Sequence, residues 1–591
     1  MAAALDETRR AQTILALQSW AAGGCVRYSL AVAAAKTSGR PVGSIGPAAG
    51  FDARRALDVA CWLVIAASAL QILMFSYGRD QGIYAMVASG VGHGQMPYRD
   101  LWDFKPPGIF LIYALAELLF GKAMWGVRVL EVLGLLGMVF AFRRFSRLVF
   151  GEARAGLLGG ALAALTHAQL EFWHTAQPET FGGFLTAAAL VFTVNADLSR
   201  RRVYGWVGVG VLFGAAFLLK PPLGGGALVC AAYLARREWL HGATRLESLR
   251  PVLIAGAASL IPILAVAAWF WLNGAWGALA WTLFEFTPGY TALGWEGRSA
   301  PPMLWWGFTQ CFFRYGALAP AALFAALLMR PIHSREREGL LLVLGVIAMH
   351  ITGIAMQGKF FPYHYGATLP LLGLLGGLGL LKLWRLCLTG GTGGILAFAS
   401  FTYLFASMQT ATTDVPLSFW ERSAERMRSL YSGEWFRDPR QLDAKLYYVA
   451  DYNLRADERV AELIRQHTEA KQYVLVWGFE PVIYWLSERP PATKYIYNVA
   501  QRSSWDRERA RKDMLRELAQ TPPALIVVQR NDVFPMVTGD TLDSRRSLEE
   551  TFPELRALLS SRFELLERIE DFDVYVLKQP AAPPDSSDVL D

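Results

Sequence analysis

Long apolar runs recur along this chain from Ala56 to Met408 and then stop. Most are close to the roughly 20 residues that an α-helix needs to cross the hydrocarbon core of a bilayer. Inside lipid the backbone polar groups have no water to bind, so such runs must form helices that satisfy their own hydrogen bonds. With 53% hydrophobic and only 18% charged residues among 591, the sequence predicts a polytopic α-helical membrane protein.

We predict about eleven transmembrane helices. Their expected ranges are 57–76, 123–142, 155–172, 180–196, 203–219, 223–235, 251–272, 303–329, 339–357, 366–382 and 390–408. The apolar stretch from Pro107 to Gly121 is expected to form a helix that lies at the membrane surface and does not cross. A second surface helix is expected over residues 83–91, where apolar side chains repeat every four positions. Together the two helices would frame the mouth of a cavity.

Basic residues orient the predicted helices. Alternate connections are strongly basic, as at residues 143–154, 200–202 and 330–337, and such connections face the cytoplasm. The connections between them hold almost no basic residues, so the first loop (residues 77–122), the second turn (residues 173–179) and the C-terminal tail face outward. The tail has no cysteine and no Asn-x-Ser/Thr sequon. We therefore predict a bacterial inner membrane protein with a cytoplasmic N-terminus.

The chain is expected to have three parts. Residues 1–55 form a disordered cytoplasmic tail, residues 56–408 form the membrane domain, and residues 409–591 form a soluble periplasmic α/β domain. Short β-rich runs in this last part alternate with helical patterns at Tyr473–Trp477, Ala524–Val528 and Val574–Leu577. The net charge of +7 sits mostly in short connections and is not gathered on one face with aromatic residues, so nucleic acid is not an expected partner.

The first loop concentrates the ionisable residues of the outward face. Between Gly78 and Gly108 it holds three aspartates, two arginines and a lysine among Tyr, Trp and Pro. Ionisable groups at a bilayer edge indicate a functional site. An enzyme on that face has no ATP or nucleotide sugar, so its activated donor arrives embedded in lipid. Transfer from a polyprenyl-phosphate sugar needs a carboxylate to take the acceptor's proton and cations or a metal to hold the leaving phosphate.

Asp80 and Lys105 supply these two kinds of group. The alternative for Asp80 is a surface acid that pairs with Arg79 or caps the helix beginning near Gly82. Lys105 precedes two prolines, which fix an extended backbone and would hold its ammonium group at a set height. The alternative for Lys105 is a side chain that only reaches for the membrane surface.

Two further aspartates of the first loop have two open interpretations. Asp103 is a candidate catalytic acid and Asp100 a candidate substrate contact. Equally, the sequence PYRDLWD predicts a turn in which both acids pair with Arg99 and Lys105.

Other candidates lie at other outward helix ends. Glu179, in the turn HTAQPE, is a second catalytic acid or a residue that favours a helix N-terminus. Lys220 and Lys359 are candidate phosphate-binding residues or anchors of helix ends. Arg314 stands inside an apolar run, which indicates an internal anion partner or a broken helix. The remaining expected substrate contacts are Tyr84, Tyr98 and His364.

The sequence assigns no cofactor with certainty: the lipid-linked donor is a substrate, and a divalent metal stays an open alternative. A divalent metal finds no support in the sequence, because the first loop has no HxH or DxD pair and Asp80 is well separated from Asp100. Two acids and a cation can perform the transfer without a metal.

Several motifs together resemble the GT-C superfamily of integral-membrane glycosyltransferases. They are the acid after the first helix, the loop ending PYRDLWDFKPPG, the segment FGKAMWGVRVLEVLGLLGMVFAFRRFSRLVFG and the QPE turn. Within the superfamily the motifs resemble the family-39 group of protein O-mannosyltransferases and bacterial lipid A aminoarabinose transferases. The resemblance covers residues 57–408 and is most specific from Asp80 to Arg147.

The resemblance implies an inverting transfer of a sugar, with Asp80 near the reacting centre and Lys105 on the donor phosphate. Glu179 lies where the family keeps a second-loop acid. Gln81 stands where many members have a second acid after the first, so the resemblance implies no carboxylate pair at this point. The implied sugar is a hexose or pentose of the mannose or aminoarabinose type, and the acceptor is a glycolipid, a polysaccharide or a protein.

A carrier or flippase for a lipid-linked sugar is the alternative function. It would use the same basic groups to bind the headgroup without chemistry. Transporters place polar groups near the bilayer midplane on broken helices, and Arg314 is the residue that fits this description. The other ionisable residues gather at one outward face, which favours the enzyme.

Overall fold

The computed structural model describes residues 53–198, 202–314, 334–388, 418–449 and 452–578, together with positions 392, 396 and 399. The chain divides into two compact units, Met1–Leu57 and Asp58–Asp591, and the second unit carries every contact discussed below. Most of the predicted tail 1–55 and of the predicted helix 390–408 lies outside the described residues.

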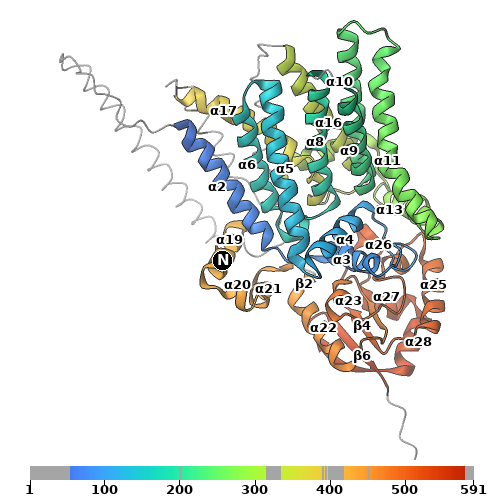
Figure 1. Ribbon diagram of the computed structural model, residues 1–591. Helices are drawn as coiled ribbons and strands as arrows, with labels where there is room; N and C mark the ends of the chain where they lie inside the picture. The colour runs from blue at the N-terminus through green and yellow to red at the C-terminus, as the bar shows by residue number, and fades with distance from the viewer. Residues whose placement is uncertain are drawn as a thin grey trace, which may run out of the picture. The chain divides into compact units, whose positions relative to one another are not determined.

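Helices occupy all or part of the other ten predicted spans (Figure 1). They are α2 (Ala53–Leu73), α5 (Met124–Phe150), α6 (Ala153–Gln169), α8 (Pro178–Leu198), α9 (Arg202–Leu219), α10 (Gly226–Leu240), α11 (Arg250–Leu272), α14 (Ala300–Arg314), α16 (Ser334–Met356) and α17 (Leu369–Leu388). Six helices of the described part are long and apolar enough to cross a membrane: α2, α5, α8, α9, α16 and the stretch 247–272 that contains α11. The chain therefore has the build of a multi-pass membrane protein, while the predicted number of eleven stays a prediction.

Glycines let two pairs of these helices approach closely. A Cβ on Gly210 or Gly214 of α9 would collide with the carbonyl oxygens of Ala255 and Ser259 in α11. Gly377 of α17 is in the same position against Gly159 of α6. Small residues four apart are a common way to bring membrane helices together, because lipid supplies no hydrophobic force between them.

The two predicted surface helices are present as α3 (Arg79–Gly92) and α4 (Gly108–Phe120). With 13 residues, α4 is about 20 Å long, which is too short to cross roughly 30 Å of hydrocarbon. The helix α3 begins four residues earlier than predicted, so that Asp80 lies in its first turn. Their position at a membrane surface stays a prediction.

Short helical elements connect the longer helices. At the ends that approach α3 and α4 they are α7 (Glu171–His174), η1 (Pro221–Gly225), α12 (Trp276–Trp281), η3 (Thr282–Phe286), α13 (Thr287–Leu293) and η4 (Pro362–Tyr365), and η2 (Glu247–Leu249) precedes α11. Two of these elements carry or adjoin predicted site residues. Lys220 immediately precedes η1, and Lys359 and His364 flank or belong to η4.

The C-terminal part contains a four-stranded sheet of order β3-β4-β6-β5. Its strands are β3 (Val474–Trp477), β4 (Leu525–Gln529), β5 (Phe563–Ile569) and β6 (Phe572–Leu577), and its main helices are α22 (Leu454–His467), α23 (Val482–Ser487), α25 (Arg507–Gln520), α27 (Ser544–Thr551) and α28 (Pro553–Arg562). The strands β3 and β4 are parallel, and β6 runs antiparallel to both β4 and β5.

The remaining C-terminal elements are short. They are α19 (Phe419–Ser432), α20 (Glu434–Arg437), α21 (Arg440–Leu446), β1 (Tyr448–Val449), β2 (Tyr452–Asn453), α24 (Val499–Arg502) and α26 (Pro535–Thr538). The predicted α/β character is confirmed, and the three predicted strands match β3, β4 and β6 to within two residues. The edge strand β5 was missed because its sequence, FELLERI, is rich in charge and mostly exposed. The solubility of this part stays a prediction.

Candidate active site

Asp80 and Lys105 meet across the first loop. Lys105 Nζ lies 3.9 Å from Asp80 Oδ2, and both side chains are largely buried. Arg79 does not pair with Asp80, because its guanidinium binds Glu480 Oε1 at 2.6 Å. Asp80 is also not the cap of α3, since Gly78 occupies that position. Both structural alternatives that the sequence left open for Asp80 are therefore disfavoured.

A glutamine from the second turn orients Asp80. Gln177 Nε2 donates to Asp80 Oδ2 at 3.2 Å, and the hydroxyl of Tyr84 donates to Gln177 Oε1 at 2.9 Å. Tyr84 is fully buried, so this predicted substrate contact serves as a support for Gln177. Among the described residues none donates to Asp80 Oδ1, which leaves that oxygen open to an incoming hydroxyl group.

Glu179 and Lys220 form a second buried pair beside the first. Glu179 lies in the first turn of α8, and Lys220 Nζ donates to its Oε1. The other carboxylate oxygen of Glu179 is buried without a hydrogen-bond partner in the described part of the chain. The ring of Tyr363 lies near both lysines, with its centroid 5.2 Å from Lys105 Nζ and 5.6 Å from Lys220 Nζ. The two pairs thus share one aromatic neighbour.

Lys359 and His364 complete the group. Lys359 is 1% exposed and its ammonium donates to the carbonyl of Tyr290 at 2.7 Å. His364 is also buried, and its Nδ1 lies 2.9 Å from the carbonyl of Lys359. Both residues therefore lie at the edge of the lysine group.

The positive charges of Lys105, Lys220 and Lys359 repel one another. Burial, with added repulsion from Lys105 and Lys220, lowers the pKa of Lys359 to about 6. Burial also lowers the pKa of Lys220 to about 8, with Glu179 opposing and Lys105 reinforcing the change. Burial is the largest influence on Lys105 and disfavours its charged form, but Asp80, Tyr290, Asp103 and Glu179 together outweigh burial and raise the pKa of that lysine. Buried ammonium groups in mutual repulsion form a site for an anion.

Asp103 is held from two sides. Its Oδ1 accepts from the hydroxyl of Tyr497 at 2.5 Å and its Oδ2 from the backbone N–H of Lys105 at 3.3 Å. Burial raises the pKa of Asp103 to about 6, although Lys105 and the Tyr497 hydroxyl both act to lower it. An acid with this pKa can hold or release a proton near neutral pH.

Two other predicted contacts have structural roles in the same loop. Asp100 accepts hydrogen bonds from the side chain of Arg99 and from the backbone N–H of Met96, which is the turn that the sequence offered as its alternative. Tyr98 has a positive φ of 68° and is buried. Its hydroxyl donates to the carbonyl of Lys105 at 2.7 Å. Tyr98 therefore fixes the backbone that carries the lysine.

A buried ionic network behind the site was missed by the sequence analysis. Arg128 and Glu131, three residues apart in α5, pair at 3.0 Å with both side chains fully buried. Glu131 Oε1 also binds His167 Nε2 at 2.7 Å and accepts the backbone N–H of Ala176 at 2.6 Å, while Arg128 donates to Thr175 Oγ1. The signal was present, because opposite charges inside an apolar helix rarely lack a role.

The contacts of Gln81 explain why a glutamine follows Asp80 in this chain, where the resemblance would allow a second acid. Its Nε2 lies 3.1, 3.2 and 2.6 Å from the backbone carbonyl oxygens of Phe172, Trp173 and Thr175, and its Oε1 accepts from the N–H of Gly78. A carboxylate at this buried position would face carbonyl oxygens without a proton to donate. Gln81 therefore ties the first loop to the second turn and is not a reacting group.

Arg314 and a metal site remain without support. Arg314 is the last residue of α14, and its side chain lies outside the described part of the chain. Within the described residues no cluster of His, Cys, Asp and Glu could hold a metal ion.

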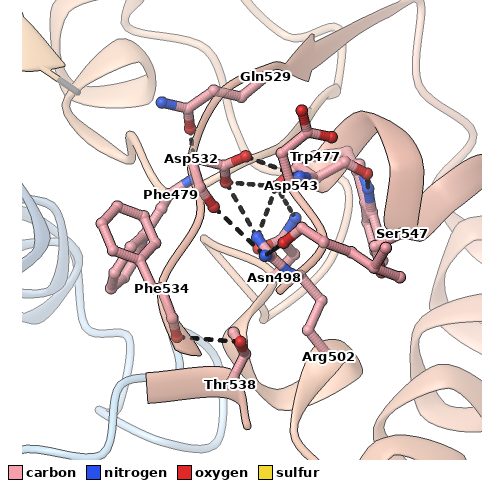
Figure 2. Close-up of polar contacts among 12 residues, drawn as sticks. Trp477, Phe479, Asn498, Arg502, Gln529, Asp532, Phe534, Thr538, Asp543 and Ser547 are labelled. Atoms are coloured by element: carbon pink, nitrogen blue, oxygen red, sulfur yellow. Dashed lines mark hydrogen bonds and ion pairs between the residues drawn. The ribbon is translucent and has the colours of Figure 1, made fainter. Parts of the chain in front are cut away.

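A polar cluster at the carboxyl ends of β3 and β4 is a support and not a site (Figure 2). Asp532 accepts from the backbone N–H of Ser544 and from Arg502 Nη1, and Asn498 Nδ2 donates to Ser544 Oγ at 2.7 Å. Trp477 donates its indole N–H to the carbonyl of Ser544. These residues are fully buried and bind one another, so the cluster holds the loops of the sheet together.

A pocket of about 220 Å³ lies elsewhere in the C-terminal part. It is lined by Tyr448, Val449, Tyr452, Asn453, Ala456, Glu480, Gln529, Glu570, Asp571 and Phe572. None of the predicted site residues lines it, and its three carboxylates suit an anionic phosphate poorly. The buried lysine group beside Asp80 is therefore the better candidate for a phosphate-containing substrate.

Comparisons with known proteins concern the family and the fold of the chain. Residues 104–269 match the family model of dolichyl-phosphate-mannose-protein mannosyltransferase. The crystal structure of ArnT from Cupriavidus metallidurans bound to undecaprenyl phosphate has a TM-score of 0.51 at 17% identity, over 90% of this chain and 99% of that chain. ArnT in the apo state has a TM-score of 0.50 at 15% identity, over 88% and 97%. No curated protein matches the sequence.

The family match and the ArnT-like fold together confirm the resemblance to the GT-C glycosyltransferases. The family match begins at Phe104, beside Lys105, and ends in α11, so it takes in Glu179 and Lys220 as well as the Arg128–Glu131 network. At 17% identity the likeness to ArnT concerns the fold. The roles of individual residues remain to be argued from their geometry.

Proposed function

We propose that the chain is a membrane glycosyltransferase that moves a sugar from a polyprenyl-phosphate donor to an acceptor hydroxyl group. The observation that carries this proposal is the convergence of three buried lysines, Lys105, Lys220 and Lys359, beside an oriented carboxylate, Asp80. An anion site next to a base is the arrangement that transfer from a sugar phosphate requires. The family match and the ArnT-like fold support the same class of reaction.

In the proposed reaction the acceptor oxygen attacks the anomeric carbon of the donor as the carbon–oxygen bond to phosphate breaks. Asp80 takes the proton of the acceptor hydroxyl through its Oδ1, while Gln177 holds Oδ2. The polyprenyl phosphate leaves with the bonding electrons, and the lysines stabilise its negative charge. A single displacement of this kind inverts the anomeric configuration.

Asp103 and Glu179 complete the proposed machinery. Asp103 lies between Lys105 and Tyr497 and tunes the charge around the phosphate. Glu179 keeps Lys220 in place, and its unpaired oxygen is a candidate contact to the sugar. Lys105 is near enough to Asp80 to link the two halves of the site, the base and the phosphate.

The finer assignments belong to the same proposal. The family-39 resemblance favours a sugar of the mannose or aminoarabinose type and a lipid, glycan or protein acceptor. The pattern of basic connections favours a bacterial inner membrane with the site and the C-terminal domain on the periplasmic side. ArnT bound to undecaprenyl phosphate supports a polyprenyl phosphate as the lipid carrier.

The test is transfer of radiolabelled sugar from a panel of polyprenyl-phosphate donors to total membrane extract by the purified full chain. We expect the label to move to a new species with wild-type protein and not with Asp80→Asn. Donor that binds but is never consumed, whichever sugar it carries, would contradict the enzyme and favour the carrier.

A further inference from the structure

The C-terminal part reaches the first loop through backbone pairing. Trp102 N donates to the carbonyl of Lys494 at 2.7 Å, and Trp102 forms a parallel bridge with Tyr495. The side chain of Trp102 is fully buried among aromatic rings, with Tyr495 at 5.5 Å and Tyr497 at 5.7 Å between centroids. Trp102 of the first loop is thus joined to residues 494–495 by one isolated β-bridge.

A side-chain hydrogen bond extends this pairing into the site. The residue after Trp102 is Asp103, whose Oδ1 accepts from the Tyr497 hydroxyl at 2.5 Å. Both side chains are buried, with exposed fractions of 1% each. Two residues further on is Lys105, whose backbone N–H donates to the same carboxylate. Tyr497 of the C-terminal part therefore binds Asp103, and Asp103 in turn binds the backbone of Lys105, the proposed phosphate-binding residue.

A third contact fixes the start of α3. Arg79, the residue before Asp80, is sandwiched between Phe479 and Phe534 and binds Glu480. Phe479 and Glu480 follow directly after the strand β3. Contacts from the C-terminal part thus hold the residues next to both halves of the site, Asp80 and Lys105.

We propose that residues 494–497 and Glu480 of the C-terminal part position the two halves of the site, and that Tyr497 is the positioning residue that keeps Asp103 turned away from the ammonium group of Lys105. This inference rests on the proposed function of the same site. It assigns the C-terminal part a direct role in catalysis in place of a separate binding module.

The physical reason lies in what Asp103 would do without its partner. A buried carboxylate that loses a donor either takes up a proton or turns to the nearest cation. The nearest cation is Lys105, and an Asp103–Lys105 ion pair would neutralise the charge that holds the donor phosphate. Loss of the Tyr497 hydroxyl should therefore raise the KM for the donor at pH values where Asp103 is ionised, and less where Asp103 is protonated.

Several groups face Asp103 and set its titration. Lys105 lowers the pKa of Asp103 and Asp80 raises it. The other groups are the hydroxyls of Tyr84, Tyr98, Tyr290, Tyr363 and Tyr497. Of these the Tyr497 hydroxyl donates a hydrogen bond to the ionised form. Its removal should free the ionised carboxylate to turn to Lys105, an effect that should fade towards acidic pH, where Asp103 takes up a proton.

The first experiment compares Tyr497→Phe with wild type and with Tyr473→Phe, which changes an exposed tyrosine of the same part. For Tyr497→Phe we expect a higher donor KM that approaches the wild-type value at acidic pH, and for Tyr473→Phe the wild-type KM at every pH. A Tyr497→Phe enzyme with the wild-type KM and pH profile would overturn the inference while leaving the transferase intact.

Hydrogen exchange supplies a readout that does not need activity. We expect faster amide exchange over residues 98–105 in Tyr497→Phe and over the start of α3 in Glu480→Gln, with unchanged exchange in α16. Wild-type exchange rates in both variants would overturn the positioning role. If the wild-type protein transfers no sugar, the proposed function fails, and the exchange data still decide whether the C-terminal part orders the loop.

Discussion

Gln177 donates its side-chain amide to Asp80, with Nε2 and Oδ2 3.2 Å apart. Gln177 comes from the second turn and Asp80 from the first loop, so the bond brings two outward connections to one carboxylate. Tyr84 fixes the other end of the same amide. The candidate base is therefore oriented by residues that have no proton to give or take near neutral pH.

Replacement of Gln177 should lower turnover more than binding. Gln177→Ala removes a neutral donor from Asp80 and leaves the lysine group in place, so we expect kcat to fall about 10- to 100-fold with a donor KM within about twofold of wild type. Steady-state kinetics with the labelled donor give both values. An unchanged kcat would show that Asp80 needs no such orientation.

Lys105→Ala should weaken donor binding. A charge-assisted contact to phosphate is worth about 1.5–3 kcal/mol, so the dissociation constant for the donor should rise about 10- to 100-fold. The matched control is Lys122→Ala in the same loop. Lys122 pairs with the exposed Glu488 at 3.1 Å, and its ammonium group lies over the ring of Trp485, away from the site. Equal donor affinity in the two variants would remove the phosphate role of Lys105.

Donor binding should take up a proton. With a pKa of about 6, Lys359 is mostly neutral at pH 7.5 in the empty site, whereas Lys220, at about 8, is mostly charged. An anion favours the charged form and raises both pKa values. Binding at pH 7.5 should thus consume up to one proton, and affinity should fall as the pH rises above about 6, more steeply above about 8 where Lys220 also loses its proton.

Calorimetry in buffers of different ionisation enthalpy measures this uptake. A phosphodiester donor does not itself titrate in this range, so the protein supplies the whole effect. Lys359→Ala should bind without the uptake. A binding enthalpy that is independent of the buffer in the wild-type protein would contradict the charge state assigned to Lys359.

Arg128 should be essential for stability. Arg128→Met leaves Glu131 buried without its main cation, which costs about 3 kcal/mol or more. We expect a clearly lower Tm in detergent, together with a loss of activity because the network holds Thr175 and Ala176. Arg144→Met, at an exposed position with a long 3.4 Å contact to Asn195, should keep the wild-type Tm. Equal Tm values in both variants would argue against the network.

The helices were predictable from the sequence because each apolar run must satisfy its own backbone. The short α4 was recognised by length and by the charge pattern on either side. The α/β character of the C-terminal part was also readable, because β3 and β4 are buried apolar runs. The strand β5 was not readable, because an exposed edge strand with charged residues has no distinctive pattern.

The charged residues of the candidate site could be predicted from the sequence, but the residues that orient them could not. Asp80, Lys105, Glu179, Lys220 and Lys359 were each named from a charge at an outward helix end, and the structure brings them together. Their supports are distant in sequence. Nothing local to Gln177 or Tyr497 shows that one binds Asp80 and the other Asp103, since both contacts depend on how separate segments pack.

The most direct test of the account compares donor binding and sugar transfer in wild type and Asp80→Asn. The change keeps the shape of the side chain and removes the base, so we expect unchanged expression, donor affinity within about threefold of wild type, and transfer reduced by about 10²-fold or more. A variant that still transfers sugar at the wild-type rate would contradict the role of Asp80 and with it the proposed mechanism.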